Sequence, residues 1–96
     1  MSTLKSTIDA KTDTFAANKA SMQGAVDDLR ALLATIEEGG GDKARKKHMD
    51  RGKLLPRQRI EKLIDKDTPF LEFSALAGHG LYKDEVPAGG LITGLG

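Results

Sequence analysis

The sequence predicts an α+β protein in which helices come first and short β-strands follow. Two patterns predict this order: apolar residues recur at helical spacing before residue 39, whereas apolar and polar residues alternate after residue 70. A third observation is that glycines separate the two patterns. A chain of 96 residues, 39% of them hydrophobic and 4% aromatic, is one domain at most and has a small core.

The N-terminal third of the chain contains one strong helix pattern. Residues 1–12 are polar and unpatterned, so we expect a flexible arm there. An apolar stripe follows, with steps of three, four or seven residues between its members: Phe15, Met22, Val26, Leu29, Leu33 and Ile36. This spacing predicts a helix over residues 13–38. The glycines at 39–41 are expected to end it, because glycine takes the left-handed cap conformation without strain.

Two shorter helices are predicted next. Asp42 is expected to cap the first of them, whose last turn is basic and which ends before Gly52. Pro56 suits the first position of the second, which carries three apolar residues on one side: Ile60, Leu63 and Ile64. Residues 13–68 are therefore expected to form a helical segment.

Residues 69–96 are expected to contribute β-strands. Residues 70–76 alternate, with Leu71, Phe73 and Ala75 on one face and Glu72 and Ser74 on the other. Glycines at 78–80 and a loop at 84–87 separate this strand from a second β run that begins at residues 91–93. Because a lone pair of short strands is marginal in water, we expect further strands from sequence beyond these residues and interpret the chain as a fragment.

The charges are segregated along the chain. Residues 43–62 carry a net charge of +7, while the segments on either side each carry −3. Such a basic block indicates an anionic partner, and two alternatives are a small nucleic-acid-binding module and a helical interaction module that uses the apolar stripe. The absence of aromatic residues between positions 43 and 62 removes the stacking groups that single-stranded nucleic acids need.

Several classes of protein find no support in the sequence. With no cysteine there is no disulfide or thiolate chemistry, and no apolar run approaches a membrane span. His48 and His79 are isolated, so we expect packing or capping roles and no metal site. Residues 94–96 read Gly-Leu-Gly, which is only part of a dinucleotide fingerprint, and a strand bend is the favoured interpretation.

Several runs of sequence resemble one family in order and spacing. Residues 38–45, reading EGGGDKAR, and then residues 51–60, 63–65, 69–74 and 86–96 are similar to the opening of acyl-CoA carboxylase carboxyltransferase (beta) subunits. The segment from Phe15 to Asn18 and the triple glycine resemble the methylcrotonyl-CoA branch more than the propionyl-CoA branch. The resemblance covers about residues 15–96.

The resemblance implies transfer of a carboxyl group from carboxybiotin to an acyl-CoA, 3-methylcrotonyl-CoA in leucine degradation. It implies an incomplete crotonase-like domain, with residues 69–96 as its first strands, and backbone oxyanion donors that lie beyond residue 96. We therefore expect no catalytic residue here and no activity from this chain alone. The implied partners are a biotin carboxylase/biotin carrier (alpha) subunit, which carries the biotin, and other beta subunits. No nucleic acid, membrane or metal is implied. The expected location is the bacterial cytoplasm, or the mitochondrial matrix in a eukaryote.

The basic block offers candidate ligands for the phosphates of CoA, because arginine and lysine hold such anions by charge-assisted hydrogen bonds. Lys53, Arg57 and Arg59 are the first choices. The whole candidate set consists of six cations: Lys43, Arg45, Arg51, Lys53, Arg57 and Arg59. The alternative is that these side chains form ion pairs within the subunit or its interfaces, or cover a solvated helix face.

Overall fold

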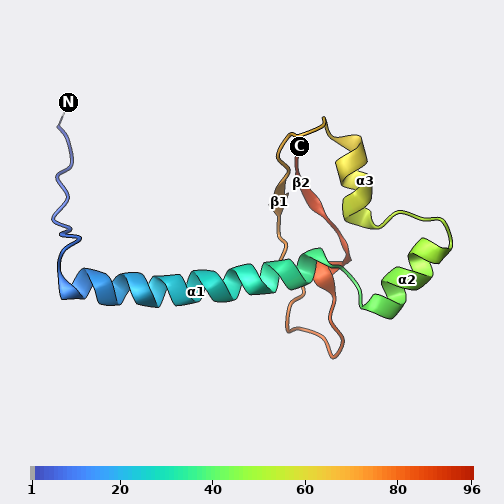
Figure 1. The fold of residues 1–96 in the computed structure, drawn as a ribbon, viewed down its shortest axis with the longest axis horizontal. Coiled ribbons are helices and arrows are strands. Elements are labelled where there is room, and N and C mark those ends of the chain that lie inside the picture. Colours follow the sequence, from blue (N-terminus) through green and yellow to red (C-terminus); the bar gives the residue numbers. More distant parts are fainter. Residues whose placement is uncertain (1) are drawn as a thin grey trace. The chain divides into compact units, whose positions relative to one another are not determined.

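A computed structural model describes residues 2–96, and Met1, the first residue of the expected arm, lies outside the described residues (Figure 1). The elements, in chain order, are α1 (Asp13–Glu37), α2 (Asp42–Asp50), α3 (Pro56–Leu63), β1 (Leu71–Phe73), the 3-10 turn η1 (Pro87–Gly90) and β2 (Thr93–Leu95). This order confirms the prediction of an α+β chain with its helices first. The chain divides into two compact units, one ending at Ala31 and the other running from Leu32 to Gly96.

The first unit contains most of α1. Residues 2–12 form neither helix nor strand. The helix starts at Asp13 because the Thr12 hydroxyl accepts a hydrogen bond from the backbone N–H of Phe15 at 3.2 Å, which satisfies one of the free donors of the first turn. Within this unit the predicted stripe is only partly covered: Met22 is 65% exposed and Leu29 43%, whereas Phe15 and Val26 are half-buried.

The ends of the helices follow the glycines and the proline. Gly39 has φ of +80° and donates to the Ile36 carbonyl at 3.0 Å, which confirms the predicted end of α1. Pro56 begins α3 as predicted, and the Gln58 side chain accepts from the Leu55 N–H at 2.8 Å. The prediction that Asp42 caps α2 is wrong.

Gly41 is the capping residue of α2, because its φ of −60° and ψ of 161° give it the extended conformation of a cap. Asp42 is displaced into the first helical turn, where its carboxylate pairs with Arg45 instead of the backbone. Glycine can cap a helix without a side-chain oxygen. A prediction based on side-chain oxygens alone therefore placed the cap one residue too late in the chain.

The two strands pair with each other in an antiparallel sheet, with Leu71 opposite Leu95 and Phe73 opposite Thr93. The strand predicted over residues 70–76 is shorter, because Ser74 has φ of +57° and its carbonyl accepts a turn hydrogen bond from Ala77. The second strand starts two residues later than predicted, since Leu91 still closes η1 by donating to the Ala88 carbonyl at 3.1 Å.

Side chains alternate along β1 as predicted, but the polar residue lies on the packed face. The Glu72 side chain is only 16% exposed, whereas Leu71 and Phe73 are 60% and 45% exposed. On the same face, Gly94 lies opposite Glu72 and the ring of Phe70 covers it. A methyl group at Gly94 would lie 2.5 Å from the Phe70 ring and closer still to the Leu71 carbonyl oxygen.

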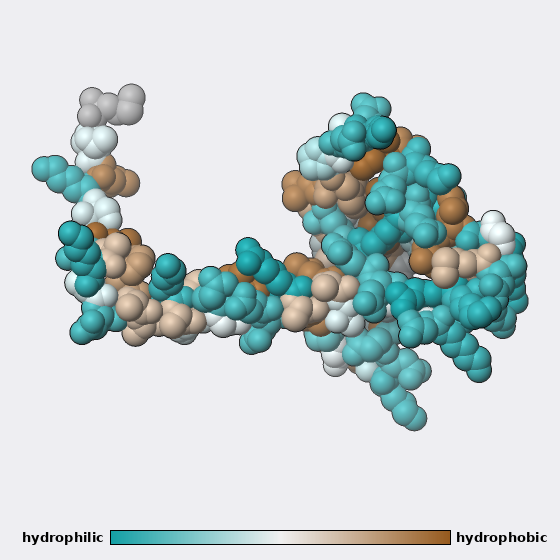
Figure 2. Space-filling model, in the orientation of Figure 1, coloured by the Kyte–Doolittle hydropathy of each residue, from teal (hydrophilic) through white to brown (hydrophobic). Residues whose placement is uncertain are grey.

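The apolar core is small. Among residues 2–96, the buried hydrophobic side chains are those of Ile36 and Ala88, which are 6% and 5% exposed. Figure 2 shows hydrophobic residues on the visible surface, between hydrophilic ones. No helix in this part of the chain has both the length and the apolar character that crossing a bilayer requires. The few specific contacts of the second unit therefore carry much of its tertiary organisation.

Candidate functional site

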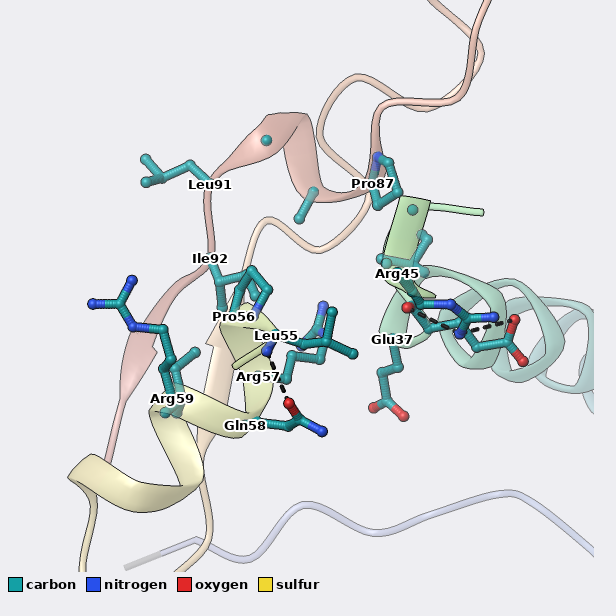
Figure 3. Close-up of a pocket in the computed structure, with 17 residues that line it drawn as sticks. Glu37, Arg45, Leu55, Pro56, Arg57, Gln58, Arg59, Pro87, Leu91 and Ile92 are labelled. Carbon is teal, nitrogen blue, oxygen red and sulfur yellow. Dashed lines mark hydrogen bonds and ion pairs between the residues drawn. The ribbon is translucent and has the colours of Figure 1, made fainter. Parts of the chain in front are cut away.

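The second unit contains an open cavity of about 710 Å³ between the end of α1, the start of α3 and η1 (Figure 3). Its lining combines apolar side chains, glycine backbone and three arginines. The lining residues are Ile36, Glu37, Glu38, Gly39, Gly40, Arg45, Leu55, Pro56, Arg57, Gln58, Arg59, Ile60, Pro87, Ala88, Gly90, Leu91 and Ile92. A volume of this size falls in the range of small-molecule binding sites.

The backbone of η1 forms one wall of this cavity. Ala88 is buried and adopts φ of +52°, a conformation that is rare for a residue with a side chain. Gly89 follows with φ of +63°, and a methyl group there would lie 3.3 Å from the Ala77 Cβ, a tight contact. The small residues at 88–90 therefore let this wall turn sharply beside residue 77.

Arg57 is held by Glu72 across the second unit. The Arg57 Nη2 donates to Glu72 Oε1 at 2.8 Å, and Nη1 donates to Oε2, so the guanidinium and the carboxylate form a two-bond pair. This hydrogen bonding raises the pKa of Arg57; burial opposes the rise, and the charges of Glu72 and Glu37 add to it. Only 25% and 16% of the two side chains remain exposed. The pair ties α3 to β1.

Arg45 is also engaged within the chain. Its Nη2 donates to the Asp42 carboxylate, and its Nη1 donates to the Glu38 carbonyl at 3.2 Å. The Glu38 carboxylate lies 3.9 Å from the same Nη1. Arg45 thus links the end of α1 to the start of α2, and its guanidinium is shielded by acidic and carbonyl oxygens.

The other predicted cations divide into two groups. Arg59 lines the cavity, is exposed, and forms no ion pair with the described residues. Lys43, Arg51 and Lys53 are exposed and do not line the cavity. The structure therefore brings three of the six candidates, Arg45, Arg57 and Arg59, to one cavity, and Arg59 is the member of that trio whose charge is left without an acidic partner among residues 2–96.

Sequence reasoning identified neither Glu72, the partner of the cavity-lining Arg57, nor the apolar lining from η1. A single carboxylate between Leu71 and Phe73 was the available signal, because an acidic residue within an apolar strand needs water or a cationic partner. No sequence pattern indicated that Pro87 and Ala88 line the cavity, because their position there depends on the tertiary fold of the loop.

The histidines have local partners. His48 Nε2 lies 2.8 Å from the Leu54 carbonyl oxygen, which joins the end of α2 to the connection before α3. His79 Nδ1 lies 3.7 Å from a Glu85 carboxylate oxygen. Over residues 2–96 no group of three or more histidine or acidic side chains is arranged to hold a metal ion. Gly94 and Leu95 lie in β2, and Gly94 provides a close contact within the sheet.

Comparison with known proteins defines the class of this chain. Residues 47–96 match the carboxyl transferase domain family, and because the match covers more than half of the chain, the chain belongs to that family. The resemblance seen in the sequence is thereby confirmed.

Several relatives of the chain are beta chains or subunits of methylcrotonoyl-CoA carboxylases. The mitochondrial beta chain of Arabidopsis thaliana is 44% identical over 89 residues, which is 93% of this chain and 15% of the relative. The Dictyostelium discoideum beta chain is 49% identical over 94 residues, covering 97% of this chain and 16% of the relative. The biotin-dependent 3-methylcrotonyl-coenzyme A carboxylase beta1 subunit of Mycobacterium tuberculosis is 51% identical over 71 residues, 74% of this chain and 13% of the relative. The chain thus spans about one sixth of the length of the proteins it matches.

Proposed function

We propose that this chain forms part of a carboxyltransferase subunit that moves a carboxyl group from carboxybiotin to an acyl-CoA, with 3-methylcrotonyl-CoA as the substrate. The supporting observation is its 44–51% identity to beta chains that bear the methylcrotonyl-CoA carboxylase name. Carboxyl transfer develops negative charge on the thioester oxygen, and backbone N–H donors commonly stabilise such charge. The chain supplies a supporting part of that domain and is inactive by itself.

The proposal includes an architecture and a set of partners. Residues 13–68 would form the helical entrance to the domain, and residues 69–96 would be the first strands of a crotonase-like fold. A biotin carboxylase/biotin carrier (alpha) subunit would deliver the carboxybiotin, and further beta subunits would complete a homo-oligomer. The named relatives from Arabidopsis and Dictyostelium are mitochondrial. Their location supports the mitochondrial matrix for a eukaryotic source, and the cytoplasm is the counterpart in a bacterium.

A chimera tests this function. The homologous segment of the Dictyostelium beta chain is replaced by this chain, and the product is combined with its biotin-carrying subunit. We expect biotin-dependent carboxylation of 3-methylcrotonyl-CoA by the chimera and none by the chain alone or by the beta chain without the segment. A folded chimera that does not carboxylate this substrate contradicts the proposal, and turnover by the chain alone contradicts its supporting role.

The CoA site is proposed on the exposed part of the basic block. Lys53 and Arg59 are the first choices, since neither has an acidic partner among the described residues. Arg57 belongs to the same candidate set, but its pairing with Glu72 favours a structural role. Lys43, Arg45 and Arg51 complete the set.

Alanine substitutions in the chimera test this site. Removing one charge-assisted hydrogen bond of about 1.5 kcal/mol raises the KM for acyl-CoA about tenfold, and Lys53→Ala and Arg59→Ala are each expected to do so with little change in kcat. Lys66→Ala, which removes an exposed lysine outside the candidate set, is the matched control. Unchanged KM values for Lys53→Ala and Arg59→Ala would leave these cations without a role in CoA binding.

A further inference from the structure

The part of α1 in the first unit presents a mainly apolar seam along one face. Phe15, Met22 and Leu29 are spaced seven residues apart, and Asn18 and Ala25 follow the first two of them by three residues. All five residues belong to α1 within the first unit. Steps that alternate between three and four residues are the heptad pattern of helices that pair side by side in a coiled coil. The pattern therefore describes a surface for a second helix.

This seam is largely open. Met22 is 65% exposed and Leu29 is 43% exposed, Asn18 and Ala25 are also exposed, and Phe15 is half-buried. Among residues 2–31, which make up the described part of the first unit, there is no second helix and no strand against which these side chains could pack. Apolar side chains that stay in contact with water forgo the free energy that burial provides. A partner helix on the seam would supply that burial.

The charges beside the seam are complementary in one arrangement of two identical helices. Asp28 and Arg30 stand on opposite flanks of Leu29, because successive helical residues are about 100° apart, and neither forms an ion pair with the described residues. When two copies of α1 run parallel, opposite flanks face each other, whereas in an antiparallel pair each flank faces its own equivalent. The two charges differ by only about 3 Å in height along the axis. A parallel pair therefore brings Asp28 of each copy to the side of Arg30 of the other.

The polar member of the seam selects the same arrangement. In a parallel pair Asn18 faces Asn18 of the second copy, so the two side-chain amides can donate to and accept from each other. In the antiparallel register that matches Met22 with Ala25, Asn18 would face Leu29 and lose its hydrogen bonds to water without replacement. A single asparagine within such a seam is a known way to specify how two helices align, at a cost in stability.

We propose that α1 pairs in parallel with α1 of a second copy of this chain. The contact surface is the seam formed by Phe15, Asn18, Met22, Ala25 and Leu29. Burial of the apolar members drives the pairing, and Asn18 together with the flanking charges sets its orientation. Because the seam contains little more than two heptads, the pair is weak and forms only at high protein concentration. Its place in a larger assembly rests on the homo-oligomer of beta subunits proposed above.

Sedimentation equilibrium of the full chain over a range of concentrations tests the pairing. We expect a reversible dimer as the concentration approaches the millimolar range. Met22→Glu places a carboxylate within the seam and should raise the dissociation constant about tenfold or more, because the buried charge would have no partner. Ala20→Glu adds the same charge at an exposed position outside the seam and is the matched control. A monomeric chain at millimolar concentration, or equal effects of the two variants, overturns the inference.

Cross-linking tests the orientation, because the chain contains no cysteine of its own. Ala25→Cys places two thiols face to face across the seam of a parallel pair, and diamide should oxidise them to a disulfide-linked dimer. Ala17→Cys, at an exposed position outside the seam, is the control and should cross-link more slowly. Equal rates for the two variants would refute the parallel seam. A monomeric chain together with an active chimera would refute the pairing and leave the proposed carboxyltransferase function intact.

Discussion

The part of α1 before Leu32 and the unit from Leu32 to Gly96 are stabilised in different ways. In residues 13–31, helical hydrogen bonds and the Thr12 cap connect neighbours along the chain, and exposed residues such as Met22 contribute little packing. In residues 32–96, contacts join positions far apart, as in the Arg57–Glu72 pair and the contact of Phe70 with Gly94. Changes to the first region should therefore alter local helix content, whereas changes at a few positions in the second should affect the whole unit.

Gly94→Ala is expected to give the largest effect. The new methyl group would overlap the Leu71 carbonyl and the Phe70 ring, so the strands must separate or the ring must move. Overpacking of this kind costs about 1–3 kcal/mol, which is a large part of the stability of a unit with so small a core. The midpoint of urea unfolding, followed by circular dichroism, should fall clearly. An unchanged midpoint would show that the sheet contributes little to this unit.

Arg57→Ala comes next in expected size. It leaves a mostly buried carboxylate, Glu72, without its two hydrogen bonds, at a cost of about 2 kcal/mol. Arg57→Lys should cost less, because it keeps the charge and loses the paired geometry. Urea unfolding measures both, with Lys62→Ala as an exposed control from the same helix. A loss no larger than that of the control would refute the role of this pair in joining α3 to β1.

The same pair predicts a pH profile. Because Glu72 raises the pKa of Arg57, the stabilisation from the arginine is fully present below the pKa of arginine in the unfolded chain and is lost only as pH rises through the raised value. Between about pH 7 and 10, titration of Arg57 should therefore cause no loss of unfolding free energy. The difference in stability between the native chain and Arg57→Ala should stay constant over this range, and a steep decline there would contradict the assignment.

The smallest effect is expected in the first region. Gly24 lies within α1, and a methyl group there would meet no other atom within 4 Å. Gly24→Ala should stabilise the helix by about 1 kcal/mol, because alanine loses less backbone entropy in a helix than glycine does. The far-ultraviolet helix signal should rise while the unfolding midpoint of residues 32–96 stays the same. A shift of that midpoint would contradict the view that the two regions are stabilised independently.

The sequence was most informative where the determining interactions are local. The stripe from Phe15 to Ile36 predicted α1 to within one residue at its C-terminal end, and Pro56 marked the start of α3. The sequence was less informative where the backbone departs from common conformations. The side-chain oxygen of Asp42 predicts a cap at that residue, whereas in the structure Gly41 caps α2 with its extended backbone.

The candidate site shows the same limit. The basic block contains Arg45, Arg57 and Arg59, which the structure brings to one cavity. Their different roles could not be predicted, because ion pairing with Glu72 or Asp42 depends on tertiary geometry and not on composition. Alternation along β1 likewise separated the two faces of the strand without showing which of them would be packed.

The close contact at Gly94 also selects how the two strands align. If β2 slipped by one residue in either direction, Thr93 or Leu95 would take the place of the glycine beneath the Phe70 ring, and the side chain would collide with it. Steric exclusion thus rejects the neighbouring misaligned pairings during folding. Each strand has only three residues, and so few hydrogen bonds could not select one alignment of the strands. A single glycine provides that selectivity.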